Sequence, residues 1–153
     1  MKIIVHKLGK PAHDPYTELA QMYQTRMHKY FATESQILKL TEKNTERAPQ
    51  ILMQSFRNQS VRHLVICLDE RGESFDTKTL ANKLKNWTED RTIHTIHFVV
   101  GGPYGFDEAS LKLADVRWSL SKLTFQGDLA WVTLWEQLYR AASFLAGHPY
   151  HHD

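Results

Sequence analysis

Short apolar runs alternate with amphipathic stretches along the chain. A short apolar run between turn residues predicts a buried strand, whereas apolar residues three and four positions apart predict a helix. The predicted strands are 3–5, 37–40, 64–68, 93–100 and 116–120, and the predicted helices are 16–31, 45–56, 77–87, 107–113 and 129–145. This regular alternation predicts an α/β fold, a mainly parallel sheet flanked by helices, in a single domain over residues 1–153.

Particular residues define the expected ends and faces of these elements. Asp76 and Asp128 are placed to cap the third and the last helix, and the turn residues 69–72 are expected to end the third strand. The residues expected to face inward are Leu19, Met22, Tyr23, Met27 and Tyr30 on the first helix, and Ile51, Leu52 and Phe56 on the second.

Composition excludes several classes of protein. Of the 153 residues, 42% are hydrophobic and 24% are charged, which is ordinary globular usage and argues against a disordered chain. No apolar run approaches the ~20 residues that span a bilayer, so we expect no membrane association and a cytoplasmic location. Cys67, the one cysteine, lies in an apolar run and is expected to be a buried thiol. The net charge of +2 is compatible with RNA binding but does not indicate it.

Two segments near the predicted strand ends are candidates for ligand binding. The glycine loop 101–105 follows an apolar strand, and glycine lets backbone approach a ligand closely, but the same pattern is also typical of a simple turn. Ser121 and Thr124 offer hydroxyl groups after the next strand, although they equally suit a structural connection to the last helix. The glycine loop has the spacing of neither a dinucleotide fingerprint nor a Walker loop. On spacing alone both interpretations stay open.

Four motifs, in this order along the chain, favour the interpretation that these segments bind a ligand. They are Leu68-Asp69, Gly101-Gly102-Pro103-x-Gly105, the segment L-S-K-L-T-F at 120–125, and Tyr150-His151 near the end. Together they resemble the RlmH-type rRNA methyltransferases of the SPOUT superfamily, over essentially the whole length of the chain.

The resemblance implies a fold, a cofactor and a reaction. It implies a SPOUT fold with a C-terminal trefoil knot, and a homodimer whose active site borrows from the partner. The implied reaction is methyl transfer from S-adenosyl-L-methionine to N3 of a pseudouridine in large-subunit (23S) rRNA on the assembled ribosome. The residues that it assigns to the cofactor are Leu68, Gly101, Gly102, Gly105, Leu120, Ser121, Lys122, Leu123, Thr124 and Phe125.

The resemblance also assigns roles to the end of the chain. N3 of a uracil-type base must lose its proton, which calls for a nearby base or a stabilising cation. His151 is the candidate for base or hydrogen-bond positioning, and Tyr150 for substrate contact; Arg140 and His152 are the candidates for RNA binding. The alternatives are a frayed terminus for the tail and a plain helical pair between Glu136 and Arg140.

Two positions depart from the family pattern. Gly127 stands where members carry a histidine, and Trp131 where they carry an arginine, and Trp131 also suits a core position. Three functions follow: an active rRNA methyltransferase, which we favour, a methyltransferase with another RNA target, or a non-catalytic RNA- or ribosome-binding paralogue.

The nine histidines do not predict a metal centre. His148, His151 and His152 are close in sequence, but no carboxylate or thiolate completes a recognisable ligand set, so no functional metal is expected. His94 and His97 differ in parity along a strand and should point to opposite faces.

Overall fold

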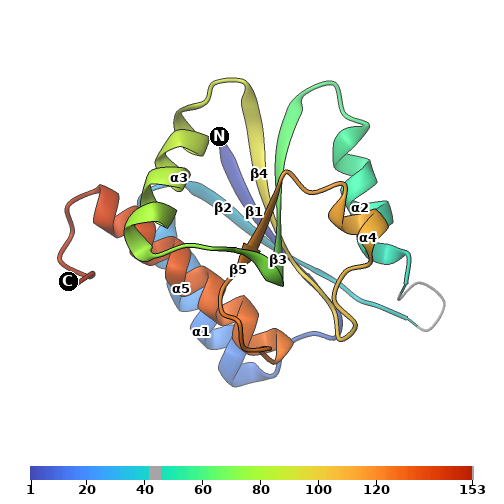
Figure 1. Ribbon diagram of the computed structural model, residues 1–153. Helices are drawn as coiled ribbons and strands as arrows, with labels where there is room; N and C mark the ends of the chain where they lie inside the picture. Colours follow the sequence, from blue (N-terminus) through green and yellow to red (C-terminus); the bar gives the residue numbers. More distant parts are fainter. Residues whose placement is uncertain (42–45, 153) are drawn as a thin grey trace.

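The computed structural model describes residues 1–41 and 46–152. Its five strands form one sheet in the order β2-β1-β4-β3-β5, and every neighbouring pair is parallel (Figure 1). The strands are β1 (Lys2–Leu8), β2 (Ala32–Leu38), β3 (Arg62–Ser74), β4 (Ile93–Val100) and β5 (Val116–Ser119). The helices are α1 (Asp14–Met27), α2 (Ala48–Arg57), α3 (Thr77–Glu89), α4 (Glu108–Leu111) and α5 (Gly127–Leu145). The predicted parallel α/β fold is confirmed.

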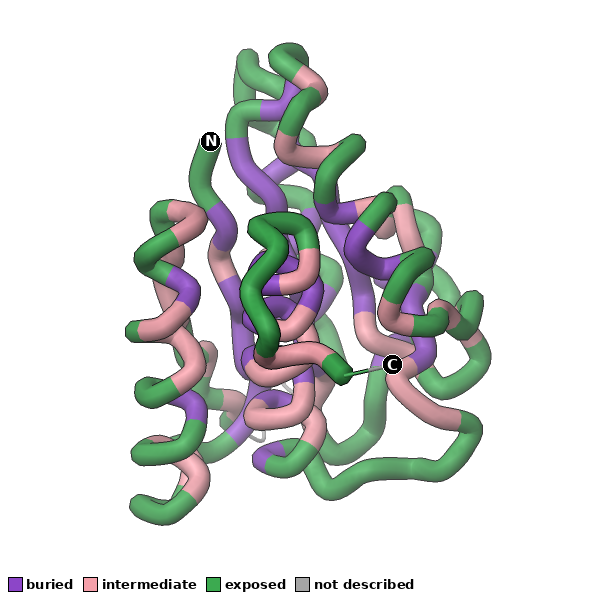
Figure 2. The backbone as a smooth tube through the Cα atoms, turned by 90° about the vertical axis from the view of Figure 1, so that its left-hand side faces the viewer, coloured by how far each residue is buried: buried purple, intermediate pink, exposed green. Residues whose placement is uncertain are grey.

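Helices cover both faces of the sheet. Helices α1, α3 and α5 pack on one face, and α2 and α4 lie on the other (Figure 1). Viewed from the side of the three helices, buried residues follow the strands and the inner faces of the helices, whereas the outer face of α1 is exposed (Figure 2). The larger core joins Ile96 and Phe98 of β4 to Leu134, Trp135 and Leu138 of α5. Removing this apolar surface from water is the main stabilising contribution.

Two helices begin with proline in the first turn, where its missing N–H has no intrahelical partner. For this reason α1 starts at Asp14 with Pro15 next, two residues before the expected start. Helix α2 starts at Ala48; the expected first residue, Thr45, lies outside the described residues. The Asp76 side chain accepts a hydrogen bond from the Thr79 amide (2.7 Å), which confirms the predicted cap of α3.

The expected inward faces are partly wrong. Leu19 and Met22 of α1 are exposed, and Ile51 of α2 is 63% exposed. In α2 the buried apolar contacts come from Met53 and Phe56. The periodicity of one helix predicts which of its sides is apolar, but the neighbouring elements decide how much of that side is buried.

Strand β3 does not end at residues 69–72 as predicted. It continues to Ser74, and beyond an irregularity it pairs again with β5, Ser74 opposite Ser119. Gly72 permits this close approach: a Cβ added there would lie 2.5 Å from the carbonyl oxygen of Arg117. The glycine is a packing position inside a strand rather than a turn.

Strand β2 begins earlier than predicted. Its sequence, Ala-Thr-Glu-Ser-Gln-Ile-Leu, is mostly polar, and it pairs only with β1 at the edge of the sheet. The prediction of 37–40 followed the apolar residues, but an edge strand needs few of them because much of it meets water.

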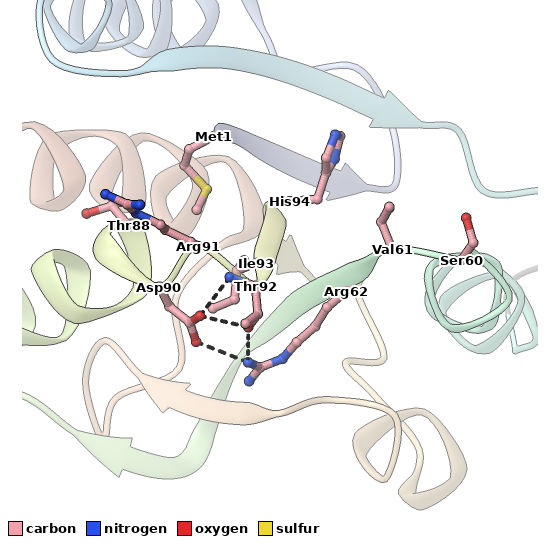
Figure 3. Close-up of a pocket in the computed structure, with 10 residues that line it drawn as sticks. All are labelled: Met1, Ser60, Val61, Arg62, Thr88, Asp90, Arg91, Thr92, Ile93 and His94. Carbon is pink, nitrogen blue, oxygen red and sulfur yellow. Dashed lines mark hydrogen bonds and ion pairs between the residues drawn. The ribbon is translucent and has the colours of Figure 1, made fainter.

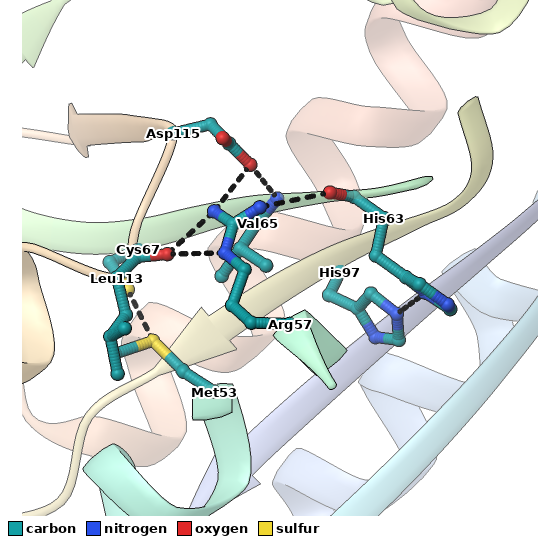
Figure 4. A network of polar contacts seen from close by, with 8 residues as sticks. All are labelled: Met53, Arg57, His63, Val65, Cys67, His97, Leu113 and Asp115. Carbon is teal, nitrogen blue, oxygen red and sulfur yellow. Dashed lines mark hydrogen bonds and ion pairs between the residues drawn. The ribbon is translucent and has the colours of Figure 1, made fainter. Parts of the chain in front are cut away.

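A polar network joins α2 to the sheet (Figure 4). The Arg57 guanidinium donates to the carbonyl oxygen of Leu113 (2.6 Å) and forms an ion pair with Asp115 (2.9 Å), which accepts from the Val65 amide (2.7 Å). Nearby, Cys67 is fully buried beside Met53, and burial raises its pKa to about 12. Cys67 is therefore a core thiol, as predicted, and not a nucleophile.

Candidate functional site

A cleft of about 1150 Å³ opens at the carboxyl edge of the sheet, where β1 and β4 end and β3 becomes irregular after Leu68. In open α/β sheets, this is the edge at which ligands bind. The walls come from segments 7–13, 68–71, 100–106 and 120–130, which are far apart in the sequence. Leu8, Leu68 and Val100 line it, and Leu8 and Val100 are the last residues of β1 and β4.

Nine of the ten residues assigned to the cofactor line this one cleft. They are Leu68, Gly101, Gly102, Gly105, Leu120, Ser121, Leu123, Thr124 and Phe125. Lys122 is exposed and is not among the lining residues. The structure thus brings together the three cofactor motifs.

The glycine loop is both a turn and a wall of the cleft. The Gly105 amide donates to the carbonyl oxygen of Gly102 (2.9 Å), and Gly105 has a positive φ of 65° that favours glycine. A Cβ on Gly102 would lie 2.6 Å from Cδ1 of Leu40, which also lines the cleft. The two sequence interpretations of this loop are therefore compatible.

The segment after β5 forms the opposite wall. The Ser121 hydroxyl accepts a hydrogen bond from the Leu123 amide (3.0 Å), which fixes a tight turn. Thr124 donates to Glu70 across the cleft mouth. Leu123 is 74% exposed and Phe125 38% exposed, although both line the cleft. Large apolar side chains in an open cleft suit a ligand with an apolar face.

A buried ion pair, which sequence reasoning missed, lies in the wall of the cleft. The Lys7 ammonium lies 2.9 Å from Oδ1 of Asp128, and both residues line the cleft. Asp128 was expected to cap α5, but the Gln126 side chain does so by accepting from the Leu129 amide (3.1 Å). Burial raises the pKa of Asp128, but hydrogen bonds from Lys7 and Gln126 and the charge of Lys7 outweigh it, so the pKa is lowered. The sequence feature that could have indicated this ion pair is Lys7, a charged residue just beyond the apolar run 3–5 of the first strand.

The residues assigned to catalysis and RNA binding gather elsewhere, at the far end of α5. The Tyr150 hydroxyl lies 3.1 Å from Oε1 of Glu136, and the Arg140 guanidinium lies 4.9 Å from the centre of the Tyr150 ring. His151 lies 3.5 Å from Arg140 through Nδ1. Arg140 also pairs with Glu136, as the plain structural alternative predicted. His152 is exposed.

Neither the tail nor Arg140 reaches the cleft of its own chain. Gly127 lines the cleft, and Arg140 follows it 13 residues later on the same helix. At a rise of 1.5 Å per residue, this separation is about 20 Å along the helix axis. The side chain that replaces the family arginine, Trp131, is buried in the core at 3% exposure and faces away from solvent.

A second hollow lies at the opposite, amino-terminal edge of the sheet (Figure 3). Its volume is about 590 Å³, and its Arg62 is already bound to Asp90 (3.0 Å) and Thr92 (2.8 Å). This edge is not where parallel sheets bind ligands. Within residues 1–41 and 46–152, no three His, Cys, Asp or Glu side chains are grouped to hold a metal ion.

The fold and the cleft define a doubly wound α/β protein with a candidate ligand-binding cleft at the carboxyl edge of its sheet. Residues 1–151 match the model of the family described as "Predicted SPOUT methyltransferase". The chain belongs to this SPOUT methyltransferase family.

Similar proteins agree with this assignment. "Ribosomal RNA large subunit methyltransferase H" from Maridesulfovibrio salexigens is 48% identical over 89 residues, which are 58% of this chain and 56% of that protein. The match thus spans little more than half of that relative. The protein of the same name from Afipia carboxidovorans is 32% identical, and the match covers 99% of each chain.

A solved structure resembles the fold. The structure described as "the putative methyltransferase Lpg2936 from Legionella pneumophila in complex with the bound cofactor SAM" has a TM-score of 0.52 and 11% identity, with 92% of this chain and 66% of that chain covered. At this identity the likeness supports the fold alone. No helix in the described part of the chain is both long and apolar enough to cross a bilayer.

Proposed function

We propose that this protein is an S-adenosyl-L-methionine-dependent methyltransferase that modifies N3 of a pseudouridine in large-subunit rRNA on the ribosome, in the cytoplasm. The observation that carries the proposal is the convergence of nine cofactor-assigned residues on one cleft at the carboxyl edge of the sheet. Family membership and the relatives named as rRNA methyltransferases support the same conclusion.

The cleft suits the cofactor chemically. Leu68, Leu120 and the exposed Leu123 offer apolar contact to an adenine ring, and the glycine loop brings bare backbone to the same space. The cofactor, when bound, supplies an electrophilic methyl group. The protein must then hold the acceptor nitrogen in line with that methyl group, so positioning supplies much of the rate enhancement.

A homodimer is part of the proposal. Because Arg140 lies about 20 Å along α5 from Gly127, a second copy of the chain is the simplest source of a tail beside each cleft. Leu19 and Met22 of α1 are exposed apolar residues one turn apart, and they are available for such an interface. In that arrangement Tyr150 and His151 orient the acceptor base and His151 accepts its N3 proton, while Arg140 and His152 contact RNA. The trefoil knot implied by the resemblance stays a prediction.

The first test is binding. Titration calorimetry with S-adenosyl-L-methionine should show saturable binding, and Leu123→Asp should weaken it at least tenfold, because it places a charge on the apolar wall. The matched control is Ile51→Asp, a change on α2 at a residue of similar exposure that does not line the cleft. Equal affinity of both variants for the cofactor would contradict cofactor binding in this cleft.

The second test is methyl transfer. Ribosomes from a strain that lacks the native modification are incubated with the protein and a labelled cofactor, and the product is mapped by mass spectrometry of rRNA digests. Label at N3 of a large-subunit pseudouridine is the expected result. Label at another nucleotide would establish the retargeted enzyme, and binding of both ligands without transfer would establish the non-catalytic paralogue.

A further inference from the structure

Lys7 and Asp128 form a buried charge pair on the wall of the cleft. Their side chains are 5% and 9% exposed, and the Nζ to Oδ1 distance is 2.9 Å. Exposed ion pairs are common, but two buried charges carry a desolvation cost that a well-packed apolar pair would avoid. Ile3 and Val5, on the same face of β1 as Lys7, belong to the larger core, so an apolar residue would suit this position for stability alone.

The pair also ties two walls of the cleft to each other. Lys7 is the penultimate residue of β1 and donates to the carbonyl oxygen of Lys10 (2.6 Å), which holds the loop after β1. Asp128 lies in the first turn of α5 and accepts from the Gln126 side chain (3.3 Å), which holds the segment before α5. The ammonium therefore stands at a fixed position between segments that both line the cleft.

The ammonium has a donor to spare. A lysine ammonium carries three N–H donors. Within residues 1–41 and 46–152, its acceptors are the carbonyl oxygen of Lys10 and the carboxylate of Asp128, which leaves one N–H. A cation held this way, on a side chain that is only 5% exposed, is strongly attractive to an oxygen that bears negative charge.

The geometry points to Lys7 as a ligand-binding residue: we propose that its ammonium, held by Asp128, donates to an anionic oxygen of the ligand in the cleft. Two sources have this chemistry, the amino-acid carboxylate of the cofactor, and the oxygen of a uracil-type base as N3 loses its proton. The inference rests on the proposed methyltransferase function and adds a residue to it. It also gives this chain a fixed cation at the cleft end of α5, where Trp131 offers none.

The test separates the ammonium from the pair. Asp128→Asn removes the carboxylate and keeps the cation, whereas Lys7→Met combined with Asp128→Asn removes both charges and leaves neither one buried alone. Because Asp128→Asn leaves the cation buried without its partner, its melting temperature should lie below that of the double variant. Ligand affinity and kcat, and not melting temperature, therefore decide between a ligand-binding and a merely structural Lys7. Lys2→Met is the control, because Lys2 lies on the same strand and forms an exposed ion pair with Glu34.

Calorimetry with three ligands identifies the oxygen: S-adenosyl-L-methionine, S-adenosylhomocysteine, and 5′-methylthioadenosine, which lacks the carboxylate. If Lys7 binds the cofactor carboxylate, the double variant should bind the first two ligands about 10- to 100-fold more weakly than Asp128→Asn, with 5′-methylthioadenosine unchanged. If Lys7 faces the base, all three affinities should stay unchanged while kcat on ribosomes falls by a similar factor.

Two outcomes would overturn the inference, and they are distinguishable. Wild-type protein that binds the cofactor and methylates ribosomes, with a double variant equal to Asp128→Asn in affinity and kcat, would show that Lys7 is only structural. Wild-type protein that binds none of the three ligands would overturn the proposed function itself, and this inference with it.

Discussion

Nε2 of His6 lies 2.9 Å from Nδ1 of His97, and both imidazoles are buried under Phe56. A third imidazole extends this row of hydrogen-bonded rings, since Nε2 of His97 lies 2.8 Å from Nδ1 of His63. Burial lowers the pKa of His6 to about 4; burial and the neighbouring histidines lower that of His97 to about 3. The native state therefore holds these rings neutral, linked by hydrogen bonds across three strands.

The three linked histidines predict that the protein is less stable in acid. Unfolded histidines titrate near pH 6.5, so between about pH 6.5 and 4 the unfolded state binds protons that the folded state refuses. The free energy of unfolding should then decrease as the pH falls, by up to about 1.4 kcal/mol per pH unit for each histidine. Urea unfolding from pH 7.5 to pH 4.5 measures this slope.

Two variants check the source of the slope. His97→Phe should reduce the decrease in the free energy of unfolding per pH unit. Replacement of the exposed His28 by glutamine should leave that decrease unchanged. Equal slopes in all three proteins would assign the acid sensitivity to other groups.

Gly72→Ala should destabilise the protein by about 1 to 3 kcal/mol, because the new Cβ meets backbone atoms of Arg117 and Trp118 that cannot move aside. The control is Gly127→Ala, where an added Cβ meets nothing within 4 Å. Thermal and urea unfolding compare the two. Equal stability would mean that β5 can shift without cost.

Asp115→Ala should lower the free energy of unfolding by about 1 kcal/mol, since it leaves the Val65 amide and Arg57 without their carboxylate partner. Exchange of the Val65 amide hydrogen should accelerate. Glu73→Gln, which weakens a mostly exposed pair with Lys83, should change stability by less than about 0.5 kcal/mol. Unaltered exchange at Val65 would contradict the assigned role.

Tyr150→Phe and His151→Ala should each lower kcat for rRNA methylation about 10- to 100-fold and leave cofactor affinity unchanged, because the tail lies outside its own chain's cleft. Wild-type turnover in both variants would remove the tail from catalysis.

The partner's contribution is tested by mixing. A chain with Leu123→Asp and a chain with Tyr150→Phe and His151→Ala are co-expressed. If each cleft uses the other chain's tail, random mixing restores up to about a quarter of wild-type activity, because half of the dimers carry one intact site. No recovery in proven heterodimers would place tail and cleft in the same chain's site.

Local pattern predicted most of the fold. The buried strands 64–68 and 93–100, the capped helix after Asp76 and the core thiol Cys67 all stand as expected, because each depends on side chains adjacent in sequence. The prediction from local pattern was wrong for the start of β2, because an edge strand needs little apolar surface. It was also wrong at Gly72, which does not form a turn but lets β5 approach β3 closely.

The sequence by itself determined the alternation of strands and helices, the family motifs, and the residues expected around the cofactor, since periodicity and motif order are properties of the linear chain. Only the tertiary structure decided which of these residues meet. It placed Lys7 against Asp128, 121 positions later in the chain, and aligned three histidines from separate strands. It also set the tail apart from the cleft. Such contacts depend on strand order and helix packing, which bring distant residues together only when the whole sheet has formed.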